Sequence, residues 1–141
     1  MGDNNLSLLI DRGDIRTYSA TVEDATSTIN ENFVFPNGLF QCLAVNMFIT
    51  DVGSPAVDIQ EYPGAIRWLS SGSGSVVPRT ISTLAPRWSP AKSGSNYYVV
   101  QFTPAYPMLM NPGDTIQYVN ADIEAGSSLD IIAYVNVSVL R

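Results

Sequence analysis

Few residues in this sequence could perform chemistry, because histidine is absent and cysteine occurs only once. Histidine is the usual general base near neutral pH, the commonest metal ligand and the orienting member of most catalytic triads. The single Cys42 allows no internal disulfide and no Cys/His zinc set. It stands among Phe40, Leu43, Ala44 and Val45, so we expect it to be a small buried hydrophobic residue.

Ser89-Pro90-Ala91-Lys92 matches the Ser-x-x-Lys pattern of serine acyl-enzymes. That chemistry needs the serine at the start of a helix, so that the lysine lies one turn away above the nucleophile. Pro86, Pro90 and Gly94 do not support a helix here, and the companion motifs Ser-Asp-Asn and Lys-Thr-Gly do not occur. We therefore interpret the match as a coincidence in a serine-rich loop.

The 13 carboxylates could in principle supply the acid/base pair of a glycosidase or oxygen ligands for Ca²⁺. Asp122 and Glu124 could share one face of an extended segment, and Asp58 and the neighbourhood of Glu61 offer a second group of carboxylates. No feature selects a pair, and no Asp-x-Asp-x-Asp-Gly loop occurs. Solvated turn carboxylates explain these residues better, so we predict no enzymatic activity, no metal site and no cofactor.

Arg12-Gly13-Asp14 spells the integrin-recognition tripeptide. Such a tripeptide acts when it is presented on a mobile, exposed tip. Here it separates two short strand-like segments, so we interpret it as a solvated turn.

Composition limits the class of protein further. The chain has 141 residues and a net charge of −6, and it is 45 % hydrophobic but only 14 % charged, against about 25 % charged residues in an ordinary domain. This length and hydrophobicity predict a single domain over residues 1–141 and argue against disorder. The acidic balance disfavours nucleic acid, and no apolar run approaches the ~20 residues that span a bilayer. We expect a soluble protein made in a cytoplasm, with no nucleic-acid or membrane partner.

The elements that must position any site are strands, because apolar residues alternate with polar ones and a 3.6-residue period is absent. The pattern predicts strands over Leu6–Ile10, Ile15–Val22, Ile29–Phe35, Leu39–Thr50, Val57–Tyr62, Ile66–Leu69, Val76–Leu84, Tyr97–Phe102, Thr115–Ala121 and Leu129–Arg141. The segment 70–75 resembles a linker in composition, but the strands around it favour a long hairpin loop. Pro78 predicts an edge strand or a bulge, and residues 86–96 read as irregular. Asn111-Pro112-Gly113-Asp114 predicts a tight turn.

Two alternations predict which side chains face the core: Leu43, Val45, Met47 and Ile49 on one strand, and Ile131, Ala133, Val135 and Val137 on another. Strands that are apolar on one face only belong in an antiparallel sheet. About eight such strands without crossover helices predict an all-β protein, an antiparallel β-sandwich, most economically a jelly roll. An immunoglobulin-like sandwich is the second choice, because its Cys…Trp…Cys pattern is missing.

One stretch differs from the rest in charge. Between Tyr62 and Gly113 there is no acidic residue, yet Arg67, Arg79, Arg87 and Lys92 all lie there. Both tryptophans, Trp68 and Trp88, fall in the same stretch. Tryptophan and arginine are the types most enriched at binding hot spots, so we predict a partner-binding site there. Its members are Trp88 and Arg87 at the centre, Arg79 and Lys92 at the rim, and Trp68. The alternative is that the tryptophans are core and the basic residues are scattered.

Two segments near the end of the chain are a turn that leads into a late strand, Asn111–Ile116, and the strand Leu129–Arg141. In this pattern the chain resembles single jelly-roll virion proteins, particularly the decoration or cement proteins of tailed-phage heads. The resemblance covers about the last third of the chain. It implies a structural virion protein on the outer capsid surface, with the major capsid protein as its partner. The lightly charged surface further predicts a homo-oligomer, most simply a trimer. The alternatives are a receptor- or glycan-binding head of a viral fibre, a single jelly-roll major capsid protein, and a small carboxylate hydrolase.

Overall fold

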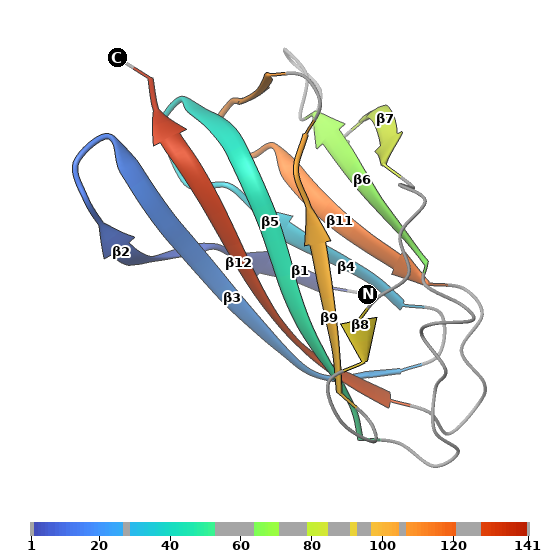
Figure 1. Cartoon of the computed structure of the whole chain (residues 1–141). Coiled ribbons are helices and arrows are strands. Elements are labelled where there is room, and N and C mark those ends of the chain that lie inside the picture. Colours follow the sequence, from blue (N-terminus) through green and yellow to red (C-terminus); the bar gives the residue numbers. More distant parts are fainter. Residues whose placement is uncertain are drawn as a thin grey trace.

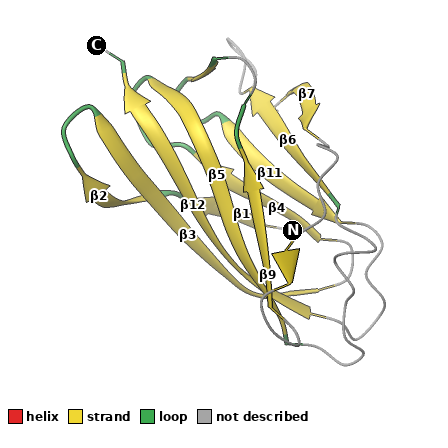
Figure 2. Cartoon of the chain, in the orientation of Figure 1, coloured by secondary structure: helices red, strands yellow, loops and turns green. Residues whose placement is uncertain are grey.

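The fold is given by a computed structural model that describes residues 2–26, 29–52, 64–70, 79–84, 91–92, 97–104, 107–120 and 128–140. Every regular element in these ranges is a strand (Figure 2). The strands are β1 (Gly2–Asn5), β2 (Ser7–Asp11), β3 (Ile15–Thr26), β4 (Ile29–Val34), β5 (Phe40–Asp51), β6 (Ala65–Ser70), β7 (Arg79–Leu84), β8 (Ala91–Lys92), β9 (Tyr97–Phe102), β10 (Met108–Met110), β11 (Thr115–Asn120) and β12 (Ser128–Val139).

The strands form two sheets that pack face to face as a β-sandwich (Figure 1). The smaller sheet has the order β1-β4-β11-β6-β7. The larger has the order β2-β3-β12-β5-β9-β8, and β10 pairs with the start of β5. All pairs are antiparallel except β1 with β4. The predicted all-β antiparallel sandwich is therefore confirmed, with one parallel pair at an edge.

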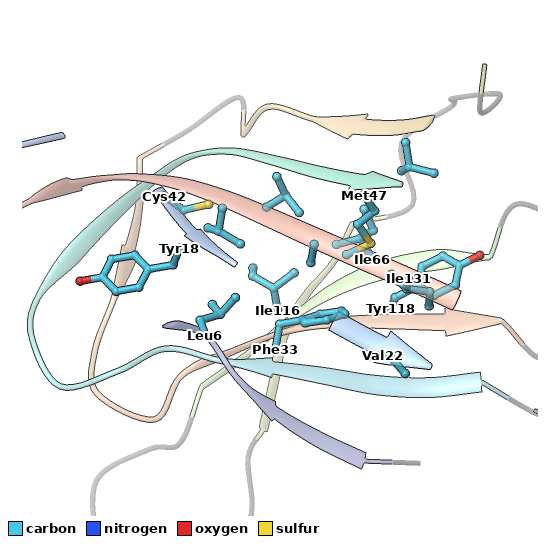
Figure 3. Close-up of a cluster of buried hydrophobic side chains, with 14 of the residues drawn as sticks. Leu6, Tyr18, Val22, Phe33, Cys42, Met47, Ile66, Ile116, Tyr118 and Ile131 are labelled. Carbon is cyan, nitrogen blue, oxygen red and sulfur yellow. The ribbon is translucent and has the colours of Figure 1, made fainter. Parts of the chain in front are cut away.

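The core lies between the sheets and follows from the period of two along the strands. On β12, Ile131, Ala133, Val135 and Val137 are all fully buried, as the alternation predicts. Figure 3 shows how the two layers meet, with Phe33, Ile66 and Ile116 of the smaller sheet against Met47 and Ile131 of the larger. Val45, Met47 and Ile49 on β5 are buried as predicted, and so is Cys42, which is a free thiol.

Leu43 corrects one sequence prediction, since it does not face the core. Between Asn136 and Val137 the pairing of β12 with β5 shifts from Ala44 to Cys42, so that Leu43 is the extra residue of a β-bulge. A bulge changes the phase of the alternation, and Leu43 and Ala44 are both only partly buried. Cys42 takes the core position that the unbroken alternation assigns to Leu43.

A second bulge lies in β3, opposite the start of β12. Leu129 pairs with Ala25 but Ile131 pairs with Val22, so β3 holds one extra residue at this point. Asp24 adopts a φ of 54°, which is unusual for a residue with a side chain. Its backbone N–H donates to Asp130 Oδ1 at 2.9 Å, which fixes the bulge.

Three short strands are not predicted from the sequence, because each forms only by pairing with another strand. β1 pairs with β4, β8 with β9, and β10 with the start of β5. β8 lies within residues 86–96, which the sequence predicts to be irregular. β10 lies in the proline-rich segment between Pro104 and Pro112. Their own sequences carry little alternation, so only the neighbouring strand identifies them.

Other local predictions are confirmed. Asp114 N–H donates to the Asn111 carbonyl at 3.0 Å, and Gly113 has a φ of 82°, which makes the predicted tight turn before β11. β6 and β7 pair as an antiparallel hairpin, and β7 is an edge strand of the smaller sheet, as Pro78 suggests. The predicted strand Val57–Tyr62 lies outside the described residues.

Candidate functional site

The structure spreads the predicted binding residues over both sheets. Arg79 begins β7, the last strand of the smaller sheet, and Lys92 lies on β8, the last strand of the larger. Arg87 and Trp88, the predicted centre of the site, lie outside the described residues. Only six residues separate β7 from β8 in sequence, which limits the distance between Leu84 and Ala91 to about 25 Å. The stretch thus connects an edge of one sheet to an edge of the other.

Trp68 lies on β6, next to the core rather than free on the surface. It is paired in register with Ile116, which is fully buried, and it packs against the core cluster as a partly buried residue. Its indole Nε1 is buried and has no hydrogen-bond partner among the described residues. A partner could therefore reach only part of this ring.

In the described part of the chain, β2 exposes three consecutive apolar residues, where the sequence pattern predicts an ordinary strand. Leu8, Leu9 and Ile10 are 49 %, 54 % and 44 % exposed, and among the described strands β2 is the first of the larger sheet, with β3 as its only neighbour there. An edge strand presents unpaired backbone N–H and C=O groups, and proteins usually protect such edges with charge. Here the charge is limited to Asp11 at the end of the strand, and the three residues before it are apolar on both faces. In the sequence, this surface is marked by the three consecutive apolar residues Leu8, Leu9 and Ile10.

Arg12-Gly13-Asp14 forms the turn between β2 and β3, as the sequence analysis interprets it. Arg12 N–H donates to the Ile15 carbonyl at 3.0 Å, and Gly13 N–H donates to Asp11 Oδ1 at 2.8 Å with a φ of 83° at Gly13. Val139 N–H donates to the Asp14 carbonyl at 2.7 Å and ties the turn to β12. The tripeptide is thus fixed in a tight turn.

Beside this turn, an open hollow of about 380 Å³ lies on the outer face of the larger sheet. Its lining residues are Ile10, Arg12, Ile15, Thr17, Leu43, Ala44 and Asn136. The bulge in β5 turns Leu43 toward this face, next to Ala44, and so supplies part of the apolar lining. Thr17 Oγ1 donates to Asn136 Oδ1 at 2.7 Å, which holds the polar side of the hollow.

Farther along the same face, three aromatic rings from three adjacent strands lie in contact. Phe48 of β5 has its ring centroid 6.0 Å from that of Tyr97 on β9 and 5.6 Å from that of Tyr134 on β12. The interplanar angles are 44° and 85°, respectively. All three rings are only partly buried, because they project from the sheet away from the core. Their spacing in sequence gave no local signal for this cluster.

Among the described residues we find no arrangement of side chains suited to catalysis. They contain no group of three or more Cys, Asp or Glu side chains that could hold a metal ion. The carboxylates Asp58, Glu61, Asp122 and Glu124, as well as Ser89, lie outside the described residues. Burial raises the pKa of the Cys42 thiol to about 12, so this group is a poor nucleophile in the folded protein.

No helix in the described part of the chain is long and apolar enough to cross a membrane. In comparisons with known proteins, no protein-family model and no curated sequence matches the chain. The fold and the surfaces described above are therefore the basis for assigning a function.

Proposed function

We propose that this chain is a structural virion protein that decorates the outer surface of a capsid and stabilises the shell of the major capsid protein. The observation that carries the proposal is the strand order. Apart from the short strands β1, β2, β8 and β10, the sheets are β3-β12-β5-β9 and β4-β11-β6-β7. The chain changes sheet from β3 to β4, β4 to β5 and β5 to β6, and again after β7, β9 and β11. This order supports a jelly roll, an architecture used in viral capsid and lectin domains.

The β2 edge supports a role in binding proteins rather than in catalysis. Exposed apolar groups on an edge strand mark a surface that associates with another chain. A lightly charged surface also lowers the desolvation cost of association, because interface cores are depleted in charge. We propose that the protein acts as a homotrimer, with the acid-free stretch 62–113 facing the shell. In that stretch Trp88 and Arg87 form the centre of the contact, and Arg79, Lys92 and Trp68 lie around it.

The test is addition of the purified protein to pre-assembled heads that lack it. We expect saturable attachment and greater resistance of the heads to heat. Trp88→Ala should weaken attachment by about 2 kcal/mol or more, as loss of a hot-spot anchor does. Lys92→Ala should change little beyond the salt dependence, because rim charges act mainly on association rate. Leu39→Ala is the matched control, since Leu39 is exposed and lies outside the stretch 62–113.

Wild-type affinity of the folded Trp88→Ala/Arg87→Ala double variant would refute the proposed contact. A protein that is monomeric in light scattering and also fails to bind heads would refute the proposal as a whole. Closed shells formed by this chain alone would instead identify a major capsid protein. We also propose that the chain is not an enzyme, and hydrolase turnover that follows the purified protein through fractionation would refute this.

A further inference from the structure

We propose that the outer face of the larger sheet is a binding site for an uncharged oligosaccharide, which lies across β3, β12, β5 and β9. The registers of these four strands place two rows of side chains next to each other on this face. One row is apolar and aromatic, and the other is rich in amides and hydroxyls. This activity goes beyond attachment to a shell and does not depend on it.

The first row crosses the strands from Thr21 through Ile132 and Phe48 to Val99. Ile132 is 36 % exposed, and Phe48 and Val99 are partly buried, so this face presents a band of apolar groups to solvent. A sugar ring carries its C–H groups on one face, and that face is stabilised by contact with apolar and aromatic groups. The row therefore matches the less polar face of a saccharide.

Tyr134 and Tyr97 extend the aromatic surface around Phe48. Because adjacent strands are about 4.8 Å apart, the three rings span about 10 Å, a length comparable with that of a disaccharide. The rings are not coplanar, since they meet at 44° and 85°. Such a stepped platform suits a ligand whose successive rings are rotated about their linkages.

The second row runs beside the first, from Ser19 through Tyr134 and Asn46 to Gln101. A side-chain amide has both donor and acceptor groups, and a hydroxyl can act as either. Sugar hydroxyls have the same dual capacity, so this row can pair with them without a charged group. Asn46 is partly exposed and Gln101 is exposed, which leaves their amides accessible from solvent.

Charge determines which saccharides fit. Neither row contains a charged residue, and the whole chain has a net charge of −6. The acidic Asp130 lies beyond the rows on β12, where it accepts a hydrogen bond from the Asp24 backbone. Acidic glycans would thus gain no ion pair in the rows and would be repelled by the protein as a whole. The neutral class is the one this face favours.

The hollow near the Arg12 turn continues this face toward one end. Asn136, in its lining, lies two residues from Tyr134 on β12, and side chains two apart point to the same side of a strand. The hollow combines the apolar Leu43 and Ala44 with the polar Thr17 and Asn136. Because Arg12 also lines the hollow and would attract an acidic group, the proposed neutral site ends before it.

The test is binding of the purified chain, without heads, to an array of neutral and acidic glycans, followed by calorimetry. The calorimetric probes are maltotriose, cellotriose, chitotriose and any neutral array hit, with 3′-sialyllactose as the acidic probe. We expect at least one neutral oligosaccharide to bind, with an affinity that changes less than about twofold between low and high salt, because no ion pair forms. Absence of binding to every neutral probe would overturn the proposal.

Substitutions then locate the site. Tyr134→Ala and Phe48→Ala should each lower affinity by about tenfold, as expected for loss of an aromatic contact. Gln101→Ala tests the polar row at an exposed position where folding is not at risk. Leu109→Ala, an exposed apolar truncation on β10, is the control and should leave affinity unchanged.

Dichroism and melting curves establish that each variant is folded. Unchanged affinity in folded Tyr134→Ala and Gln101→Ala would overturn the assignment of this face. So would a decrease in oligomer size caused by Phe48→Ala without any bound sugar, because a second copy of the chain would then cover the rings. Failure of shell attachment in the separate head assay has no bearing on these results.

Discussion

A matched pair of substitutions on β5 tests the bulge at Leu43. Val45 is 1 % exposed, whereas Leu43 is partly buried and lines the open hollow. Val45→Thr keeps the shape of the side chain but buries a hydroxyl, which costs about 1–3 kcal/mol when no partner is available. Leu43→Thr should cost less than about 1 kcal/mol, because the new hydroxyl remains in contact with water.

Urea denaturation measures both free energies of unfolding, provided that the m-values agree with that of the wild type. The melting temperatures should differ in the same order, by about 2–4 °C for each kcal/mol. A Leu43→Thr variant that is destabilised as much as Val45→Thr would show that residues 43–49 alternate without interruption. That result would refute the bulge, and with it the lining of the hollow.

Four further predictions concern the core and the turns. Val135→Asp should destabilise the fold by several kcal/mol and yield largely unfolded protein in dichroism, because it buries an unpaired charge at a fully buried position. Cys42 should resist alkylation by iodoacetamide at pH 8 in the native state and react after unfolding; rapid native labelling would contradict its burial. Burial raises the pKa values of Cys42 and Tyr118 from 9.0 and 10.0 to about 12, so both groups stabilise the fold in their neutral forms. Stability should therefore fall as the pH rises from 9 toward 12, and Cys42→Ala should flatten the lower part of that decline. Asp24→Gly should be neutral or stabilising by up to about 1 kcal/mol in thermal melts, since glycine tolerates a φ of 54°; a clear loss of stability would mean that the Asp24 side chain matters.

The long strands could be predicted from sequence because burial on one face imposes a period of two on them. The predicted Tyr97–Phe102 coincides with β9, and the predicted terminal strand includes most of β12. The sequence could not show that Leu43 faces away from the core, because the bulge at this position is defined by the pairing with β12 and leaves no local pattern. β1, β8 and β10 were missed for the same reason.

Predicting surfaces was harder than predicting the core. A charge window identifies neighbours in sequence, yet Arg79 and Lys92 belong to edge strands of different sheets. Trp68 was grouped with them by type, although its strand turns it toward the core. Phe48, Tyr97 and Tyr134 are separated by 37 residues or more in sequence, and only the order β9-β5-β12 brings them into contact. Prediction of such a cluster requires the sheet order first.

The position of β12 has a consequence for biosynthesis. This strand lies between β3 and β5, and its register joins Ser138 to Ile15 and Val139 to Phe40. During translation, β3 and β5 emerge from the ribosome long before the strand that must separate them. Until then the edges of β3 and β5 that pair with β12 have no partner, and unpaired strand edges of this kind promote aggregation. Closing contacts over such long sequence separations is also slow. The nascent chain should therefore depend on chaperone protection until β12 has been released, and synonymous codon changes that slow translation after β5 should lower the yield of folded protein.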